Sequence, residues 1–119
     1  MNNCSRPDKS IIAVQELLSG KYTILILDEL SDGAKNYNAI LNALDITSPT
    51  LTRQLKELTK QCLIKRSVSS SSPVRVEYSL TSLGMEFKDS LSSLKTWGNL
   101  YLSCVKQPEE ELYHSNSLP

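Results

Sequence analysis

The sequence predicts a mainly α-helical domain that carries one small β-hairpin. Apolar residues recur at helical spacing along most of the chain, and they alternate with polar ones in one stretch past its middle. A content of 39% hydrophobic and 22% charged residues is typical of a folded domain and not of a disordered chain. Because 119 residues leave little room for a second core, we expect one domain over residues 1–107 and an acidic tail over 108–119.

The first helix is predicted from about Pro7 to Leu18. Pro7 suits the first position of a helix, where its missing N–H costs nothing, and Gly20 is expected to end the helix in a left-handed conformation. The next segment, from Tyr22 to Leu30, contains four consecutive aliphatic residues. Periodicity alone leaves open whether this segment is a buried strand or a buried helix.

Two further helices are predicted in the middle of the chain. The first is short and covers about residues 37–44, and a tight link leads to the second, which is expected over 48–61 with Ser48 as its cap and Pro49 as its first residue. At about 100° per residue, one face of this second helix is apolar and the opposite face is basic. The apolar face holds Leu51, Leu55, Leu58 and Cys62, and the basic face holds Arg53, Lys56 and Lys60.

After Leu63 the helical period gives way to strict alternation. Two alternating runs, joined by the polar residues 69–73, predict a β-hairpin over about residues 63–80. Thr81 is then expected to cap a long helix over 81–105, and towards its end apolar residues cover most of the circumference. One small core cannot bury such a surface, so we expect it to pack against another subunit. Its candidate contact residues are Trp97, Leu100, Tyr101 and Cys104.

This order of elements is that of a winged helix-turn-helix domain: a short helix, a tight link, a capped helix with a basic outer face and a two-stranded ribbon. An α-helix fits the major groove of DNA, where its first residues reach base edges while Arg and Lys neutralise phosphates. The pattern therefore favours a protein that binds double-stranded DNA. The alternative is a winged-helix module that binds another protein and whose basic face is incidental.

The overall charge argues against nucleic acid, but its distribution does not. The chain has 13 basic and 13 acidic residues, whereas DNA-binding domains usually carry a basic excess. Within residues 47–78, however, six basic residues face only two acidic ones, and three consecutive glutamates lie in the predicted tail. We therefore expect a basic middle and an acidic end, with weak long-range attraction to DNA.

Several other function classes find no support in the sequence. His114 is the only histidine, so no catalytic Ser-His-Asp or Cys-His arrangement has a base, and no glycine-rich phosphate loop is present. The three cysteines show no CxxC spacing, which argues against a zinc site. No secretory or membrane-spanning run is apparent. We expect no cofactor, no metal and no membrane partner, and a cytoplasmic location with reduced thiols.

Several segments between Gly20 and Gly98 resemble the HxlR-type winged helix-turn-helix regulators of bacteria and archaea. Gly20–Leu27 is similar to the family's G-K-W-T-L-L-I-L, with Tyr22 in place of the usual tryptophan, and residues 35–40 are similar to K-R-F-N-E-L. Residues 46–63 parallel I-S-P-K-M-L-T-Q-R-L-R-E-L-E-x-x-G-L, with Cys62 in place of a frequent glycine. Residues 73–84 track P-P-R-V-E-Y-x-L-T-x-x-G, and a W-G pair follows at 97–98.

The resemblance implies that the segment from Tyr22 is a helix and that the protein is a homodimer built from its first and last helices. Ile11 then joins the expected interface. It also implies a transcriptional regulator that binds a pseudo-palindromic operator with half-sites about 34 Å apart. The residues implied to face DNA are Lys35, Asn36, Ser48, Thr50, Thr52, Arg53, Lys56 and Arg75.

Some regulators of this family sense oxidants through a cysteine just before the first helix, which makes Cys4 a candidate sensor. Cys4 lies several residues too early, because the family position corresponds to about Asp8 or Lys9 here. Both interpretations stay open: an ordinary exposed cysteine, or a reactive terminal thiol. A small-molecule effector in place of an oxidant is also open. Cys62 and Cys104 are expected to act as small hydrophobic residues.

Overall fold

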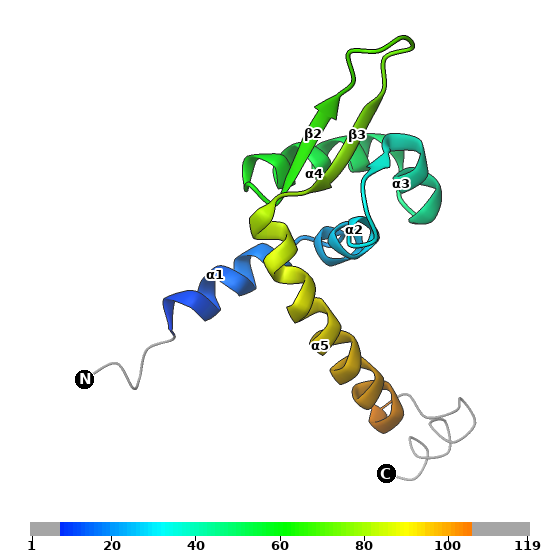
Figure 1. Ribbon diagram of the computed structural model, residues 1–119. Coiled ribbons are helices and arrows are strands. Elements are labelled where there is room, and N and C mark those ends of the chain that lie inside the picture. Colours follow the sequence, from blue (N-terminus) through cyan, green and yellow to red (C-terminus); the bar gives the residue numbers. More distant parts are fainter. Residues whose placement is uncertain (1–7, 106–119) are drawn as a thin grey trace. The chain divides into compact units, whose positions relative to one another are not determined.

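The computed structural model describes residues 8–105 (Figure 1). Its elements are α1 (Lys9–Leu18), α2 (Thr23–Leu30), β1 (Lys35–Asn36), α3 (Tyr37–Ala43), α4 (Ser48–Lys60), β2 (Ile64–Val68), β3 (Val76–Leu80) and α5 (Ser82–Val105). The chain forms two compact units, of which the first ends at Glu86 and the second begins at Phe87, within α5. The predicted fold class, mainly helical with a small hairpin, is confirmed. The predicted tail lies outside the described residues.

α1 begins two residues later than predicted, and Asp8 caps it. The Asp8 carboxylate accepts hydrogen bonds from the hydroxyl of Ser10 at 2.6 Å and from its N–H at 2.7 Å, and these bonds lower the pKa of Asp8. Pro7, the predicted first helical residue, lies outside the described residues. The left-handed conformation predicted for Gly20 is wrong, because Gly33 is the only described glycine with a positive φ. A side chain at Gly20 would instead collide with Thr23 Oγ1, so glycine permits a close approach there.

The segment whose type the sequence left open is a helix. Thr23–Leu30 forms α2, and Ile26, Leu27 and Leu30 on its inner face are buried. β1 follows and joins an antiparallel sheet of order β1-β3-β2, in which Lys35 lies opposite Tyr78. β1 was not predicted, because two residues are too short to show alternation and their extended conformation comes from pairing with β3.

α3 and α4 form the predicted helix-turn-helix. Ile40 of α3 and Leu51, Leu55 and Leu58 of α4 are buried in the core of the first unit, and each buried leucine or isoleucine contributes about 1.5–3 kcal/mol. α4 begins at Ser48, with Pro49 in its first turn and Thr47 in the cap position. The predicted capping role of Ser48 is therefore wrong, because the extended backbone that precedes the helix ends at Thr47.

The end of α4 corrects the expectation for Cys62. Gln61 is the last cap residue, and Cys62 follows in a left-handed conformation with a φ of 65°. The N–H of Cys62 donates to the carbonyl of Thr59 at 3.0 Å, and the N–H of Leu63 donates to that of Leu58 at 3.1 Å. This pair of bonds is a Schellman motif. It turns the Cys62 side chain out of the helical register, so Cys62 is exposed and not part of the apolar face.

β2 and β3 form the predicted hairpin, which projects beyond the helices of its unit in Figure 1. Ile64 pairs with Leu80 at the base, where both are buried, and Val68 pairs with Val76 near the tip. Thr81 caps α5 as predicted, because its hydroxyl accepts from the N–H of Gly84 at 3.1 Å. The same hydroxyl donates to the carbonyl of Cys62 at 2.6 Å, which joins the end of α4 to the start of α5.

Within residues 8–105, no single helix is long and apolar enough to cross a membrane. α1 and α2 pass that test of length and composition only as a pair, which is bent by 87°.

Candidate nucleic-acid interface

The outer face of α4 is basic and accessible. Arg53, Lys56 and Lys60 are exposed, whereas Leu51, Leu55 and Leu58 on the opposite face are at most 2% exposed. The buried leucines hold the helix in place, and so the three cations are presented on a rigid support. Among the described residues none of the three forms an ion pair with a carboxylate, which leaves their charges available to a phosphate backbone.

The hydroxyl groups at the start of α4 lie beside these cations. Ser48 and Thr52 are exposed and one helical turn apart, and Thr50 is half-buried. Thr50 Oγ1 accepts a hydrogen bond of 2.9 Å from Thr47 Oγ1, so one of its lone pairs is occupied within the turn. The structure thus brings together the hydroxyls and cations of α4 that the sequence analysis expects to face DNA.

Tyr37 is a residue of this surface that the sequence analysis missed. Its hydroxyl lies 2.9 Å from the carbonyl oxygen of Ser48, 2.7 Å from Ser48 Oγ and 3.0 Å from Thr52 Oγ1. The phenol thereby ties α3 to the first turn of α4. The replacement of phenylalanine by tyrosine in the segment similar to K-R-F-N-E-L was the available signal, because it adds one polar group at this position.

Lys35 and Asn36, both expected near phosphate, already have partners within the protein. The Lys35 ammonium pairs with the carboxylate of Glu29, and this hydrogen bond raises the pKa of Lys35. Asn36 caps α3, because its Oδ1 accepts from the N–H of Ala39 at 2.8 Å. Their side chains therefore support the turn before α3.

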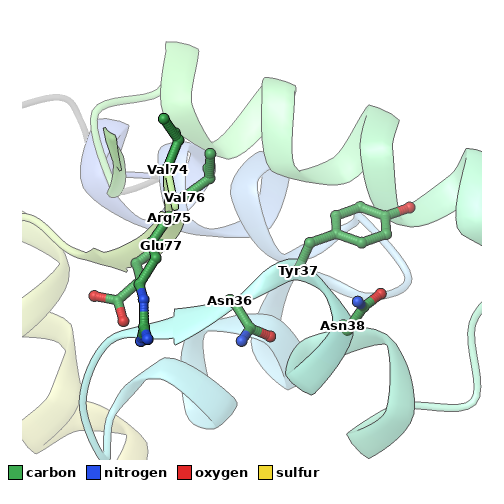
Figure 2. A pocket seen from close by; sticks show the side chains of 7 residues that line it. All are labelled: Asn36, Tyr37, Asn38, Val74, Arg75, Val76 and Glu77. Atoms are coloured by element: carbon green, nitrogen blue, oxygen red, sulfur yellow. The ribbon is translucent and has the colours of Figure 1, made fainter. Parts of the chain in front are cut away.

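The wing, which is the hairpin formed by β2 and β3, presents further cations. Lys65 and Arg66 of β2 and Arg75 next to β3 are exposed, and the carbonyl of Arg75 closes the hairpin loop by accepting from the N–H of Ser69 at 2.7 Å. A cavity of about 350 Å³ separates the wing from the start of α3. Figure 2 shows Arg75 and Glu77 on the wing side of this cavity and Tyr37 on the other, with its ring turned towards α4.

A second cavity, of about 430 Å³, lies between α4 and the sheet. Two tyrosines and three cations contribute to its lining, so basic side chains of α4 and of β2 border the same groove. Its lining residues are Tyr37, Thr52, Leu55, Lys56, Thr59, Lys60, Arg66 and Tyr78. Strand alternation predicts that Lys65 and Arg66 face opposite sides, and Arg66 is the one that lines this groove.

The expected dimer residues are accessible in the single chain. Ile11 of α1 and Trp97 and Leu100 of α5 are 58–60% exposed, and Tyr101 is 50% exposed. The rings of Trp97 and Tyr101 stack, with centroids 5.4 Å apart. Cys104 is a free, exposed thiol. Cys4, the candidate oxidant sensor, lies outside the described residues.

Within residues 8–105, no group of three or more histidine, cysteine or acidic side chains lies close enough together to hold a metal ion.

Comparison with known proteins identifies similar chains. The sequence profile of the HxlR-like helix-turn-helix family matches residues 17–106. The HTH-type transcriptional regulator YdeP of Bacillus subtilis is 36% identical over 95 residues, which are 79% of this chain and 74% of YdeP.

Two solved structures share the fold. A protein assigned as a MarR-family transcriptional regulator, from Enterococcus faecalis V583, is 38% identical, with a TM-score of 0.72 over 85% of this chain and 94% of its own. The redox regulator HypR in its reduced form is 28% identical, with a TM-score of 0.75 over 82% of this chain and 97% of its own. These likenesses confirm the winged-helix architecture.

Proposed function

Because the chain belongs to the HxlR-like helix-turn-helix family of transcriptional regulators, we propose that it binds a DNA operator as a homodimer, with α4 in the major groove. The observation that carries the proposal is the amphipathic character of α4. Its leucine face is buried, and its exposed face presents Arg53 and Lys56 next to the hydroxyls of Ser48 and Thr52. Cations and small polar groups at the start of a helix are what base edges and phosphates require.

The wing extends this surface along the duplex. Arg75 at the hairpin and Arg66 in the groove beside α4 supply charge for the phosphates that flank the contacted bases. The hairpin loop, residues 69–75, is rich in small side chains, which suits approach to a minor groove. Lys35 and Asn36 contribute by holding the turn before α3, with any phosphate contact secondary to their internal bonds.

The homodimer accounts for the exposed apolar side chains. Trp97, Leu100 and Tyr101 form an apolar surface on α5 that a monomer would leave in water, and Ile11 adds to the exposed apolar area. A two-fold dimer presents two recognition helices, so its operator is pseudo-palindromic, with half-sites about 34 Å apart. The regulators that this chain resembles come from bacteria and archaea, whose DNA lies in the cytoplasm. We therefore propose a cytoplasmic location for this protein.

The salt dependence of duplex binding tests this proposal. A dimer that contacts six phosphates should lose affinity by roughly 10³-fold between 50 and 200 mM salt, because each contact releases condensed counterions. Changing Lys56 to glutamine in both subunits should reduce the slope of log K against log salt by about 2, or about 1 per contact. Lys21→Gln, which removes an exposed cation before α2, is the matched control and should leave the slope unchanged. A flat salt response would favour the protein–protein module instead.

A redox response is a second candidate function, because the structurally similar HypR is a redox regulator. We propose Cys4 as the responsive thiol, in a chain whose other cysteines lie after α4 and in α5. Treatment with a thiol oxidant should then change duplex affinity in the unmodified protein but not in Cys4→Ser. An equal oxidant response in both proteins would remove Cys4 from consideration.

A further inference from the structure

We propose that Tyr37 is a positioning residue for base recognition, which forces the hydroxyls of Ser48 and Thr52 to accept hydrogen bonds from the bases and not to donate them. The inference rests on the proposed function, since it needs the start of α4 to lie in the major groove. It adds a rule for which bases the helix prefers.

The hydroxyl group of Tyr37 has one proton to donate and three polar neighbours. The Tyr37 oxygen lies within hydrogen-bond distance of three groups: the Ser48 carbonyl, Ser48 Oγ and Thr52 Oγ1. A carbonyl oxygen can only accept, so it takes the single phenolic proton. The phenol oxygen then has its two lone pairs left, and both hydroxyls must donate to it. All three contacts are satisfied in this one arrangement.

DNA can then reach only the outward-facing lone pairs of these two hydroxyls. Once the Ser48 and Thr52 hydroxyls have donated their only protons inward, their outward-facing lone pairs can only accept. In the major groove the base-edge donors are the N6 amino group of adenine and the N4 amino group of cytosine, whereas guanine and thymine present acceptors. The free protein is therefore set to accept from adenine or cytosine at the positions that Ser48 and Thr52 reach, and to reject guanine and thymine there.

Thr52 does not make the hydrogen bond that a threonine within a helix usually makes to the carbonyl four residues earlier. Thr59, in the same helix, donates its hydroxyl proton back to the carbonyl of Leu55, four residues earlier, at 2.7 Å. The equivalent carbonyl for Thr52 is that of Ser48, which Tyr37 occupies instead. The phenol thus replaces the local backbone bond of Thr52 with one from another helix. A phenylalanine, as in the family pattern quoted above, could not do this.

The test compares the unmodified protein with Tyr37→Phe, which removes only the hydroxyl. Duplexes are first selected from a random pool by the unmodified protein. Each adenine or cytosine of a half-site is then replaced by guanine or thymine, or by purine or pyrimidin-2-one, which lack the amino group. At one or two positions per half-site we expect these changes to weaken the unmodified protein by about 3- to 10-fold, the range for one hydrogen bond. In Tyr37→Phe the changes to guanine or thymine should have little effect, because the freed hydroxyls can donate to these bases; purine and pyrimidin-2-one, which offer no acceptor at that position, should weaken both proteins.

Two further variants make the outcome decisive. Thr52→Val, which removes one hydroxyl at nearly constant shape, should abolish the preference at one of these positions and keep it at the other. Tyr22→Phe removes a phenolic hydroxyl outside α3 and α4 and should change no base preference. Comparing each variant on the same duplexes cancels the effect of the altered base on duplex stability itself.

The possible results separate the inference from the function on which it rests. If Tyr37→Phe keeps the base preference of the unmodified protein, or weakens binding to all duplexes equally, the hydroxyl has only a structural role and the inference is wrong, while the proposed function stands. If the unmodified protein selects no duplex from the pool, the proposed function fails, and the inference fails with it.

Discussion

Cys62 adopts a backbone conformation that is unfavourable for any residue with a side chain. Its φ of 65° lies in the left-handed region, where a Cβ atom approaches the neighbouring carbonyl oxygen at a cost of roughly 1–2 kcal/mol. The conformation is required because the Schellman motif at the end of α4 bends the chain into β2. The HxlR-type pattern that residues 46–63 resemble frequently has glycine at the position of Cys62, and glycine adopts this conformation without that cost.

We predict that Cys62→Gly stabilises the protein. Relief of the left-handed strain exceeds the added flexibility of glycine in the unfolded chain, and the net gain should be about 0.5–1 kcal/mol in the free energy of unfolding. Urea denaturation measures it. Cys62→Ala is the matched control, because it removes the exposed thiol and keeps the Cβ atom; its stability should stay near that of the unmodified protein. Equal gains in both variants would assign the effect to the thiol and not to the backbone.

The junction between the hairpin and α5 depends on contact between backbones. The Thr81 hydroxyl bridges the carbonyl of Cys62 and the N–H of Gly84, and the N–H of Thr81 donates to the carbonyl of Leu63 at 3.0 Å. Gly84 is buried against that same carbonyl of Leu63, which a Cβ atom at position 84 would strike. The T-x-x-G pattern therefore serves both a helix cap and a close approach.

We predict that Gly84→Ala destabilises the fold, although alanine is the better helix former. The gain in helix propensity, about 1 kcal/mol, is outweighed by the overlap with a backbone carbonyl that cannot rotate away, and the net loss should be about 1–3 kcal/mol. Thermal or urea unfolding gives the value. Ser82→Ala, an exposed change in the same turn, should shift stability by less than about 0.5 kcal/mol. A stabilised Gly84→Ala would show that the junction can open without cost.

Elements with a strong periodic pattern were predictable from the sequence, and details that depend on tertiary partners were not. The hydrophobic period located α4, whose leucine face is buried, and the alternation of apolar and polar residues located both strands of the hairpin. β1 was not predictable, since its two residues are extended only through pairing with β3. For the candidate site, the basic face of α4 was predictable, but the bonds of Tyr37 were not. They join positions 11 and 15 residues apart, which no local pattern reveals.

At the scale of the whole molecule, the neutral total charge combines a basic surface with acidic residues elsewhere. The six basic residues in 47–78 lie on α4 and the hairpin, and Glu57 and Glu77 are the two acidic ones there. A neutral protein has little long-range attraction to DNA, so non-specific binding should be weak. In the proposed complex, specific contacts of α4 and their doubling in the proposed dimer must then supply most of the affinity.

The dimer and the DNA surface should respond to different substitutions. Trp97 is 60% exposed in the single chain, so Trp97→Ala should change little in a monomer, whereas loss of an aromatic anchor at an interface typically costs 2 kcal/mol or more. We therefore predict that Trp97→Ala raises the dimer dissociation constant by about 30-fold or more, as measured by sedimentation equilibrium. Met85→Ala, at a similarly exposed residue in the first turn of α5, is the control and should leave the dimer intact.

Arg53→Ala should show the opposite pattern, with weaker operator binding and an unchanged dimer, because Arg53 lies on the exposed face of α4. Operator binding by Trp97→Ala should recover at protein concentrations that restore the dimer, since its α4 surface is unaltered. That of Arg53→Ala should not recover, because the contact itself is missing. If Arg53→Ala dissociated the dimer while Trp97→Ala bound DNA normally as a monomer, the assignment of the two surfaces would be reversed.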